Sequence, residues 1–161
     1  MPGWFDINSL DFKTTVDDRA GMFSSVAAVN QIIDREVRES SINRNRIVVG
    51  GFSQGGAIAL LTGLADVNET KLAGVVGLST WLPPSFKDSF MKEGLAARPP
   101  ILMCHGDSDE VVNPLYHNMT IEALHQLDVT NVQQHIYPGL GRSSCQDEMM
   151  QVITWLKSVI P

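Results

Sequence analysis

The feature that most constrains the fold is a regular alternation of short apolar runs with segments of helical periodicity. The run 47–51 (IVVGG) is β-branched and ends in glycine, which is typical of a buried strand. The apolar segment 54–65 follows at once and is long enough for a helix. Such alternation predicts an α/β fold, a mostly parallel sheet with helices on both faces. Chemistry in these sheets gathers at the carboxyl ends of the strands.

The same alternation continues along the whole chain. The pattern predicts further helices at 21–39, 114–127 and 144–159. It predicts further strands at 72–79, 101–105 and 132–137. On the last helix, the apolar spacing predicts an inward face made of Met149, Ile153, Leu156 and Ile160.

Composition indicates a single soluble globular domain over residues 1–161. Of the 161 residues, 43% are hydrophobic and 19% charged, which suits one sizeable core. The net charge of -6, without a Lys/Arg cluster, argues against nucleic acid and anionic membranes as partners. We expect no transmembrane segment, because the longest apolar stretch is too short. Cys104 and Cys145 do not have the spacing of metal ligands, so we expect both to be free thiols. Because the sequence also shows no apolar leader, we expect a cytoplasmic protein, with the nucleus as a second compartment.

The most informative motif is Gly51-Phe52-Ser53-Gln54-Gly55, which fits G-x-S-x-G between a predicted strand and a predicted helix. In that context the serine stands on a tight turn with its hydroxyl exposed, as a nucleophile requires. The backbone N–H of Gln54, at the helix N-terminus, is placed to stabilise an oxyanion. The sequence therefore predicts Ser53 as a nucleophile.

A second motif, CHGDSDEVVNP, follows the third predicted strand. In this fold, a triad runs in the order Ser, Asp or Glu, His, so Asp107 and Asp109 are both candidates for the acid. Either could orient a histidine, or cap the helix that begins near Pro114. We favour Asp109 as the triad acid and Asp107 as a turn residue.

These motifs, together with LSTWLP, WFDI and SSCQDEMM, resemble the acyl-protein thioesterase family, the carboxylesterase and lysophospholipase-like branch of the α/β-hydrolases. The resemblance covers nearly the whole chain. It implies a serine hydrolase that cleaves fatty-acyl thioesters of S-acylated proteins, or small acyl esters, through an acyl-Ser53 intermediate. It places Trp81, Leu82 and Pro83 near the acyl groove. It implies no cofactor and no metal, because a Ser/His/Asp mechanism needs neither.

The sequence departs from the family at the catalytic histidine, whose position holds Arg142. Arginine has no acceptor nitrogen and a pKa above 12, so it cannot take the serine proton at neutral pH. Beside Asp109, we expect it to form a salt bridge. Loss of one triad member costs roughly 10⁴- to 10⁶-fold in kcat in serine hydrolases.

None of the four histidines is expected to replace the missing base. His105 matches a family position that is not the base, and His135 lies inside the last predicted strand. His117 and His125 fall on a predicted surface helix.

A second departure is the absence of the family's His-Gly-Leu-Gly-Asp loop, which precedes WFDI in other members and supplies the second oxyanion donor. Met1 aligns inside the family sequence, so we expect an α/β-hydrolase fold without its first strands. The strand 47–51 would then lie at an open sheet edge, where it could pair with a second copy or another chain.

Three interpretations follow. The chain is a serine hydrolase with little or no activity, or a non-catalytic homologue that binds acylated peptides, lipids or a paralogous chain. The third is that the sequence is part of a longer product that still carries Arg142.

Overall fold

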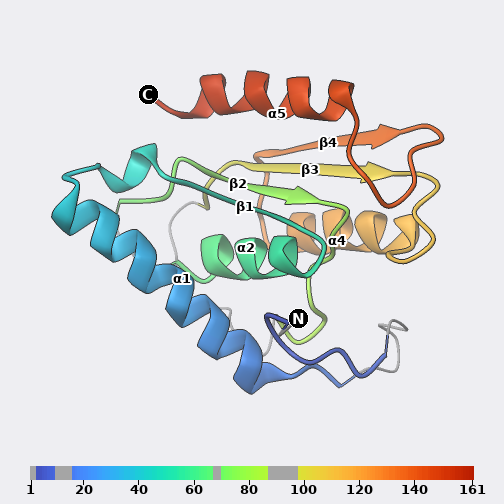
Figure 1. Ribbon diagram of the computed structural model, residues 1–161, viewed down its shortest axis with the longest axis horizontal. Coiled ribbons are helices and arrows are strands. Elements are labelled where there is room, and N and C mark those ends of the chain that lie inside the picture. The colour runs from blue at the N-terminus through green and yellow to red at the C-terminus, as the bar shows by residue number, and fades with distance from the viewer. Residues whose placement is uncertain (1–2, 10–15, 67–69, 87–97) are drawn as a thin grey trace.

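The computed structural model describes residues 3–9, 16–66, 70–86 and 98–161, and it has the predicted α/β architecture (Figure 1). The strands are β1 (Val48–Phe52), β2 (Gly74–Leu78), β3 (Ile101–Gly106) and β4 (Val132–Tyr137). The helices are α1 (Arg19–Glu39), the short 3-10 helix η1 (Arg44–Arg46), α2 (Gln54–Leu64), α4 (Pro114–Gln126) and α5 (Gln146–Val159). Each predicted strand and helix within this part of the chain is present, and its ends differ from the prediction by at most two residues.

All four strands run parallel in the order β1-β2-β3-β4. Parallel strands bring their carboxyl ends to one edge of the sheet, so the residues that follow β1, β2, β3 and β4 gather there. Of the described strands, β1 is hydrogen-bonded on one side only, to β2. Among the described residues, β1 therefore lies at the edge of the sheet.

The sheet is covered on both faces (Figure 1). On one face, α1, α2 and α4 enclose the larger core, in which nearly every residue of α2 is buried. On the other face, α5 covers a smaller core built around Val76, Leu102, Cys104 and Trp155. Burial on both sides explains why the sequences of β2 and β3 are continuous apolar runs.

The inward face predicted for α5 is wrong in part. Met149 and Ile153 are exposed, whereas Glu148 and Trp155 are buried. The Trp155 ring lies directly over Gly74 of β2, where any side chain would collide with it. Docking of this large ring on a glycine rotates the helix away from the face that the simple apolar spacing predicts.

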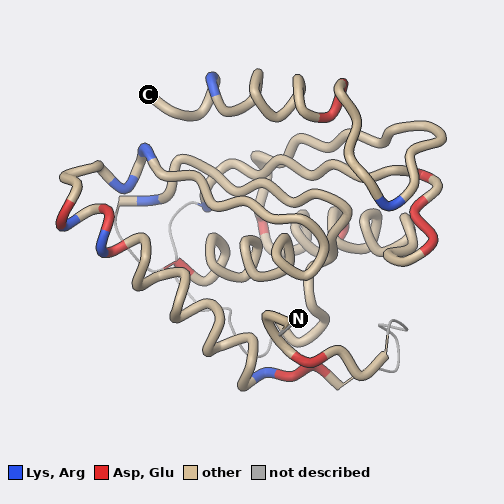
Figure 2. The backbone as a smooth tube through the Cα atoms, viewed as in Figure 1, with Lys and Arg blue, Asp and Glu red and all other residues tan. Residues whose placement is uncertain are grey.

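Charges of both signs are interspersed at the C-terminal end of α1 and around η1, and no single element gathers the basic residues (Figure 2). In the part of the chain that is described, no helix combines the length and the apolar character that crossing a bilayer requires.

Candidate active site

Ser53 stands on a sharp turn between β1 and α2. Its backbone has φ +54° and ψ −121°, a conformation that a non-glycine residue adopts only under constraint. Side chains at Gly51 and Gly56 would collide with surrounding backbone and with Thr80, so the flanking glycines are required for space. The turn is held by two hydrogen bonds, from Ser53 N to the Leu78 carbonyl (2.8 Å) and from Thr80 Oγ1 to the Ser53 carbonyl (2.6 Å).

Arg142 reaches the Ser53 hydroxyl from the loop between β4 and α5. Its Nη2 donates a hydrogen bond of 2.7 Å to Ser53 Oγ. Its guanidinium carbon lies 5.4 Å from the centroid of the Phe52 ring, a distance typical of a cation–π contact. The side chain in the expected histidine position therefore contacts the predicted nucleophile directly.

Asp109 lies behind Arg142, with a fully buried side chain. Its Oδ1 accepts hydrogen bonds from the backbone N–H groups of Val111 (2.9 Å) and Val112 (3.0 Å). Its Oδ2 has no hydrogen-bond partner among the described residues and lies 3.9 Å from Nη1 of Arg142. The expected ion pair is present, and one carboxylate oxygen faces the side chain at position 142.

Asp107 is engaged elsewhere. Its Oδ1 accepts hydrogen bonds from Gly139 N (2.7 Å) and from Ser108 Oγ (2.9 Å), which ties the loop after β3 to the loop after β4. The structure thus brings Asp109, rather than Asp107, beside residue 142.

His105 and His117 form a buried pair, with ring centroids 5.6 Å apart. His105 Nε2 lies 2.9 Å from the Val112 carbonyl and 3.6 Å from Asp109 Oδ2, so it is the protonated nitrogen. The placement of His117 on a surface helix face is wrong: it is fully buried and its Nε2 pairs with Gln134 Oε1 at 3.2 Å. Burial lowers the pKa of His105, and it lowers the pKa of His117 to about 4.

Gln54 is the first residue of α2, so its backbone N–H has no acceptor inside the helix. Its side chain joins the site to the N-terminal segment. The amide oxygen accepts from Trp4 N (2.9 Å) and the amide nitrogen donates to the Phe5 carbonyl (2.6 Å). This explains why the segment WFDI, remote in sequence, lies against the turn.

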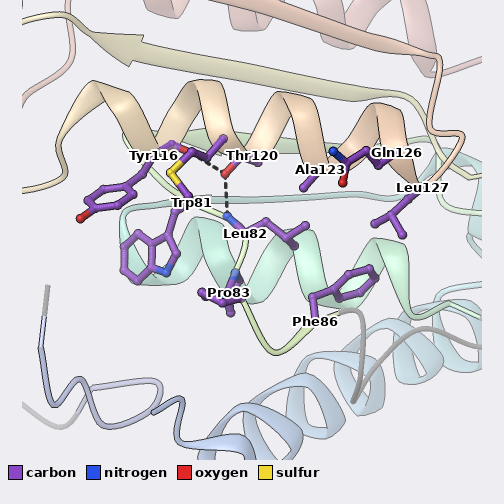
Figure 3. Close-up of a pocket in the computed structure, with 11 residues that line it drawn as sticks. Trp81, Leu82, Pro83, Phe86, Tyr116, Thr120, Ala123, Gln126 and Leu127 are labelled. Atoms are coloured by element: carbon purple, nitrogen blue, oxygen red, sulfur yellow. Dashed lines mark hydrogen bonds between the residues drawn. The ribbon is translucent and has the colours of Figure 1, made fainter. Parts of the chain in front are cut away.

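An apolar pocket of about 160 Å³ is lined in part by Trp81, the residue that follows Thr80 in the chain. Figure 3 shows it between α4 and the segment after β2, with Leu82 N hydrogen-bonded to Thr120 Oγ1 at 2.9 Å. Trp81, Leu82 and Pro83 all line it, as the resemblance implies for an acyl groove. The lining residues are Trp81, Leu82, Pro83, Pro84, Phe86, Tyr116, Met119, Thr120, Ala123, Gln126 and Leu127.

Two contacts at the site were not predicted from sequence, that of Thr80 with the Ser53 carbonyl and that of the Phe52 ring with Arg142. Thr80 follows the end of β2, next to β1, and position in a parallel sheet is the signal that could have indicated it. Phe52 is the variable residue before the serine in the G-x-S-x-G motif, and its role here is to contact the guanidinium of Arg142 with its ring.

Known proteins resemble this chain in sequence and in fold. A family model described as phospholipase/carboxylesterase matches residues 1–160. "Acyl-protein thioesterase 1" of Mycosarcoma maydis is 39% identical over 171 residues, covering all of this chain and 70% of the relative. The crystal structure of Arabidopsis thaliana SOBER1 superposes with a TM-score of 0.87 at 29% identity, covering all of this chain and 75% of that one. Zea mays acyl-protein thioesterase 2 gives a TM-score of 0.85 at 30% identity, over 99% of this chain and 73% of that one.

Proposed function

Because this chain belongs to the phospholipase/carboxylesterase family and has an α/β-hydrolase-like fold, we propose that it recognises fatty-acyl thioesters of S-acylated proteins, or small acyl esters, at Ser53, and that Arg142 holds their hydrolysis close to zero. The observation that carries the proposal is the hydrogen bond of 2.7 Å from Arg142 to Ser53 Oγ.

The residues have the following roles in this proposal. Ser53 Oγ is the nucleophile for the acyl carbonyl, and the backbone N–H of Gln54 faces the oxygen that becomes negative. Asp109 is the triad acid, whose free oxygen faces position 142. The pocket lined by Trp81 and Leu82 takes the acyl chain, because it is apolar and Trp81 follows Thr80, whose Oγ1 donates to the Ser53 carbonyl.

Hydrolysis stops at the first proton transfer. Attack by Ser53 requires a base that accepts its proton, and the guanidinium of Arg142 has donors only. His105 does not substitute, because its Nε2–H is directed at the Val112 carbonyl. The site therefore retains recognition while it lacks the step that forms the acyl-enzyme.

The same hydrogen bond favours a second candidate, a non-catalytic homologue that binds acylated peptides, lipids or a paralogous chain. The edge strand β1, unpaired on one side within the described residues, is the surface that suits a partner chain. The two candidates differ in whether Ser53 turns over any substrate.

The test is binding and hydrolysis of an S-palmitoylated peptide by the purified protein, with the unacylated peptide as control and Ser53→Ala as blank. We expect binding that requires the acyl group, without turnover above the blank. Turnover above the blank would show that another group takes the serine proton. Equal binding of the two peptides would contradict the acyl site.

A further inference from the structure

We propose that Arg142 makes this site a receptor for the carboxylate of an acyl chain, so that a free fatty acid binds in preference to an uncharged acyl compound. The inference rests on the proposed acyl recognition and names the ligand class that the altered site prefers.

The guanidinium of Arg142 is held in place before any ligand binds. It lies over the Phe52 ring, 3.9 Å from the buried Asp109 carboxylate and 2.7 Å from the Ser53 hydroxyl. These contacts come from different parts of the chain, and they reduce the rotamer freedom that a long side chain loses on binding. The side chain is nonetheless 33% exposed, so a ligand can reach it.

Most donors of this guanidinium remain available. Of its five N–H groups, one donates to Ser53 Oγ, and the 3.9 Å separation from Asp109 is too long for a hydrogen bond. Among the described residues, no further acceptor is hydrogen-bonded to Arg142. A planar guanidinium with free adjacent donors matches the two oxygens of a carboxylate.

The other polar groups at the site are donors as well. Ser53 Oγ already accepts from Arg142, so its own O–H is left to donate. The backbone N–H of Gln54 is the third donor, at the start of α2. A histidine at position 142 would supply an acceptor nitrogen here. With arginine in its place, the site favours a ligand head that only accepts hydrogen bonds, and the positive charge of the guanidinium favours a carboxylate over an uncharged ester or thioester.

Asp109 weakens this attraction without cancelling it. Its Oδ1 is engaged by two backbone N–H groups, and the carboxylate is fully buried behind the guanidinium. A ligand on the exposed side of Arg142 is closer to the positive charge than to Asp109, and Coulomb energy falls with distance.

The apolar pocket requires a ligand with a chain. Thr80, which donates to the Ser53 carbonyl, is followed directly by Trp81 of the pocket wall. In this proposal the carboxylate binds Arg142 and the hydrocarbon tail extends toward Trp81 and Leu82, which gives an amphipathic fatty acid both of its contacts.

The test is isothermal titration of octanoate and octanamide, which share chain length and a planar head but differ in charge and in the N–H donors that only the amide carries. For the unaltered protein we expect octanoate to bind at least about tenfold more tightly, since hydrogen bonds to a charged group are roughly twice as strong. Arg142→Gln should reduce this preference to about one while octanamide binding persists, which also reports that the pocket is folded. Arg38→Gln, a change at an exposed arginine of α1, should leave the preference intact.

Arg142→Lys is the second variant, because it keeps the charge and loses the planar fork; we expect the preference to fall several-fold. Equal binding of the two ligands by the unaltered protein would overturn the carboxylate site alone. An undiminished preference in Arg142→Gln or Arg142→Lys would overturn the role of the guanidinium. Failure of both ligands to bind would overturn the acyl site itself and this inference with it.

Discussion

Replacing Arg142 by histidine should restore hydrolysis, because the two groups that a catalytic histidine needs are already in contact with this position. Ser53 Oγ lies 2.7 Å from one guanidinium nitrogen. Asp109 Oδ2 lies 3.9 Å from the other and has no hydrogen-bond partner among the described residues. An imidazole here would accept from the serine and donate to the aspartate.

The size of the effect follows from the missing step. Loss of the catalytic base lowers kcat by roughly 10⁴- to 10⁶-fold in serine hydrolases. Because an imidazole is shorter than an arginine side chain, we expect only part of this factor to be regained. We therefore expect kcat/KM to rise at least about 10³-fold over the unaltered protein. The absolute rate should stay about 10²- to 10³-fold below that of a complete site if Gln54 supplies the sole backbone oxyanion donor.

The assay is release of p-nitrophenol from p-nitrophenyl butyrate, with Ser53→Ala/Arg142→His as the blank. Arg142→His/Asp109→Asn should lose at least about 10²-fold of the gain, because the imidazole is no longer held in the correct tautomer. The rate should rise with pH as the imidazole deprotonates. If a folded Arg142→His protein binds octanamide yet hydrolyses nothing above the blank, the missing base is not what holds this serine inactive.

Three further predictions concern the pocket, the turn and the histidine pair. Ala123→Phe should fill the pocket and weaken binding of the S-palmitoylated peptide at least about tenfold in fluorescence anisotropy, since little space remains for the chain. Gly51→Ala should lower the free energy of unfolding by at least about 1–3 kcal/mol in urea, because its Cβ would overlap the first turn of α2, whereas Gly141→Ala should be tolerated. Because the pKa of His117 is about 4 in the folded protein against 6.5 for an ordinary histidine, the unfolded chain takes up the proton first. Protonation of His117 should therefore cost about 3 kcal/mol of stability as the pH falls through this window; His117→Gln should remove this contribution, and His125→Gln should retain it.

The fold was predictable because the central strands are buried on both faces and their sequences are uninterrupted apolar runs. The turn at Ser53 was predictable for a similar local reason, since glycines at positions 51 and 56 are required by direct backbone contact. The ion pair of Arg142 with Asp109 followed from charge and from the meeting of strand ends.

What sequence could not reveal depends on contacts between elements. The burial of Trp155 follows from its fit over Gly74 of β2, a residue far from α5 in the sequence, and this fit leaves Met149 exposed. The burial of His117 follows from its pairing with Gln134 on β4 and with the ring of His105. In each case a partner on another element overrides the apolar spacing of the helix.

Covalent labelling of Ser53 decides whether Arg142 silences a serine that is otherwise correctly held. The unaltered protein, Arg142→His and Arg142→His/Ser53→Ala are exposed to a fluorophosphonate, and adducts are located by mass spectrometry. We predict an adduct on Ser53 in Arg142→His only. Labelling of Ser53 at equal rates in the unaltered protein and in Arg142→His would contradict the silencing role of Arg142, because the serine would then be reactive with the arginine in place.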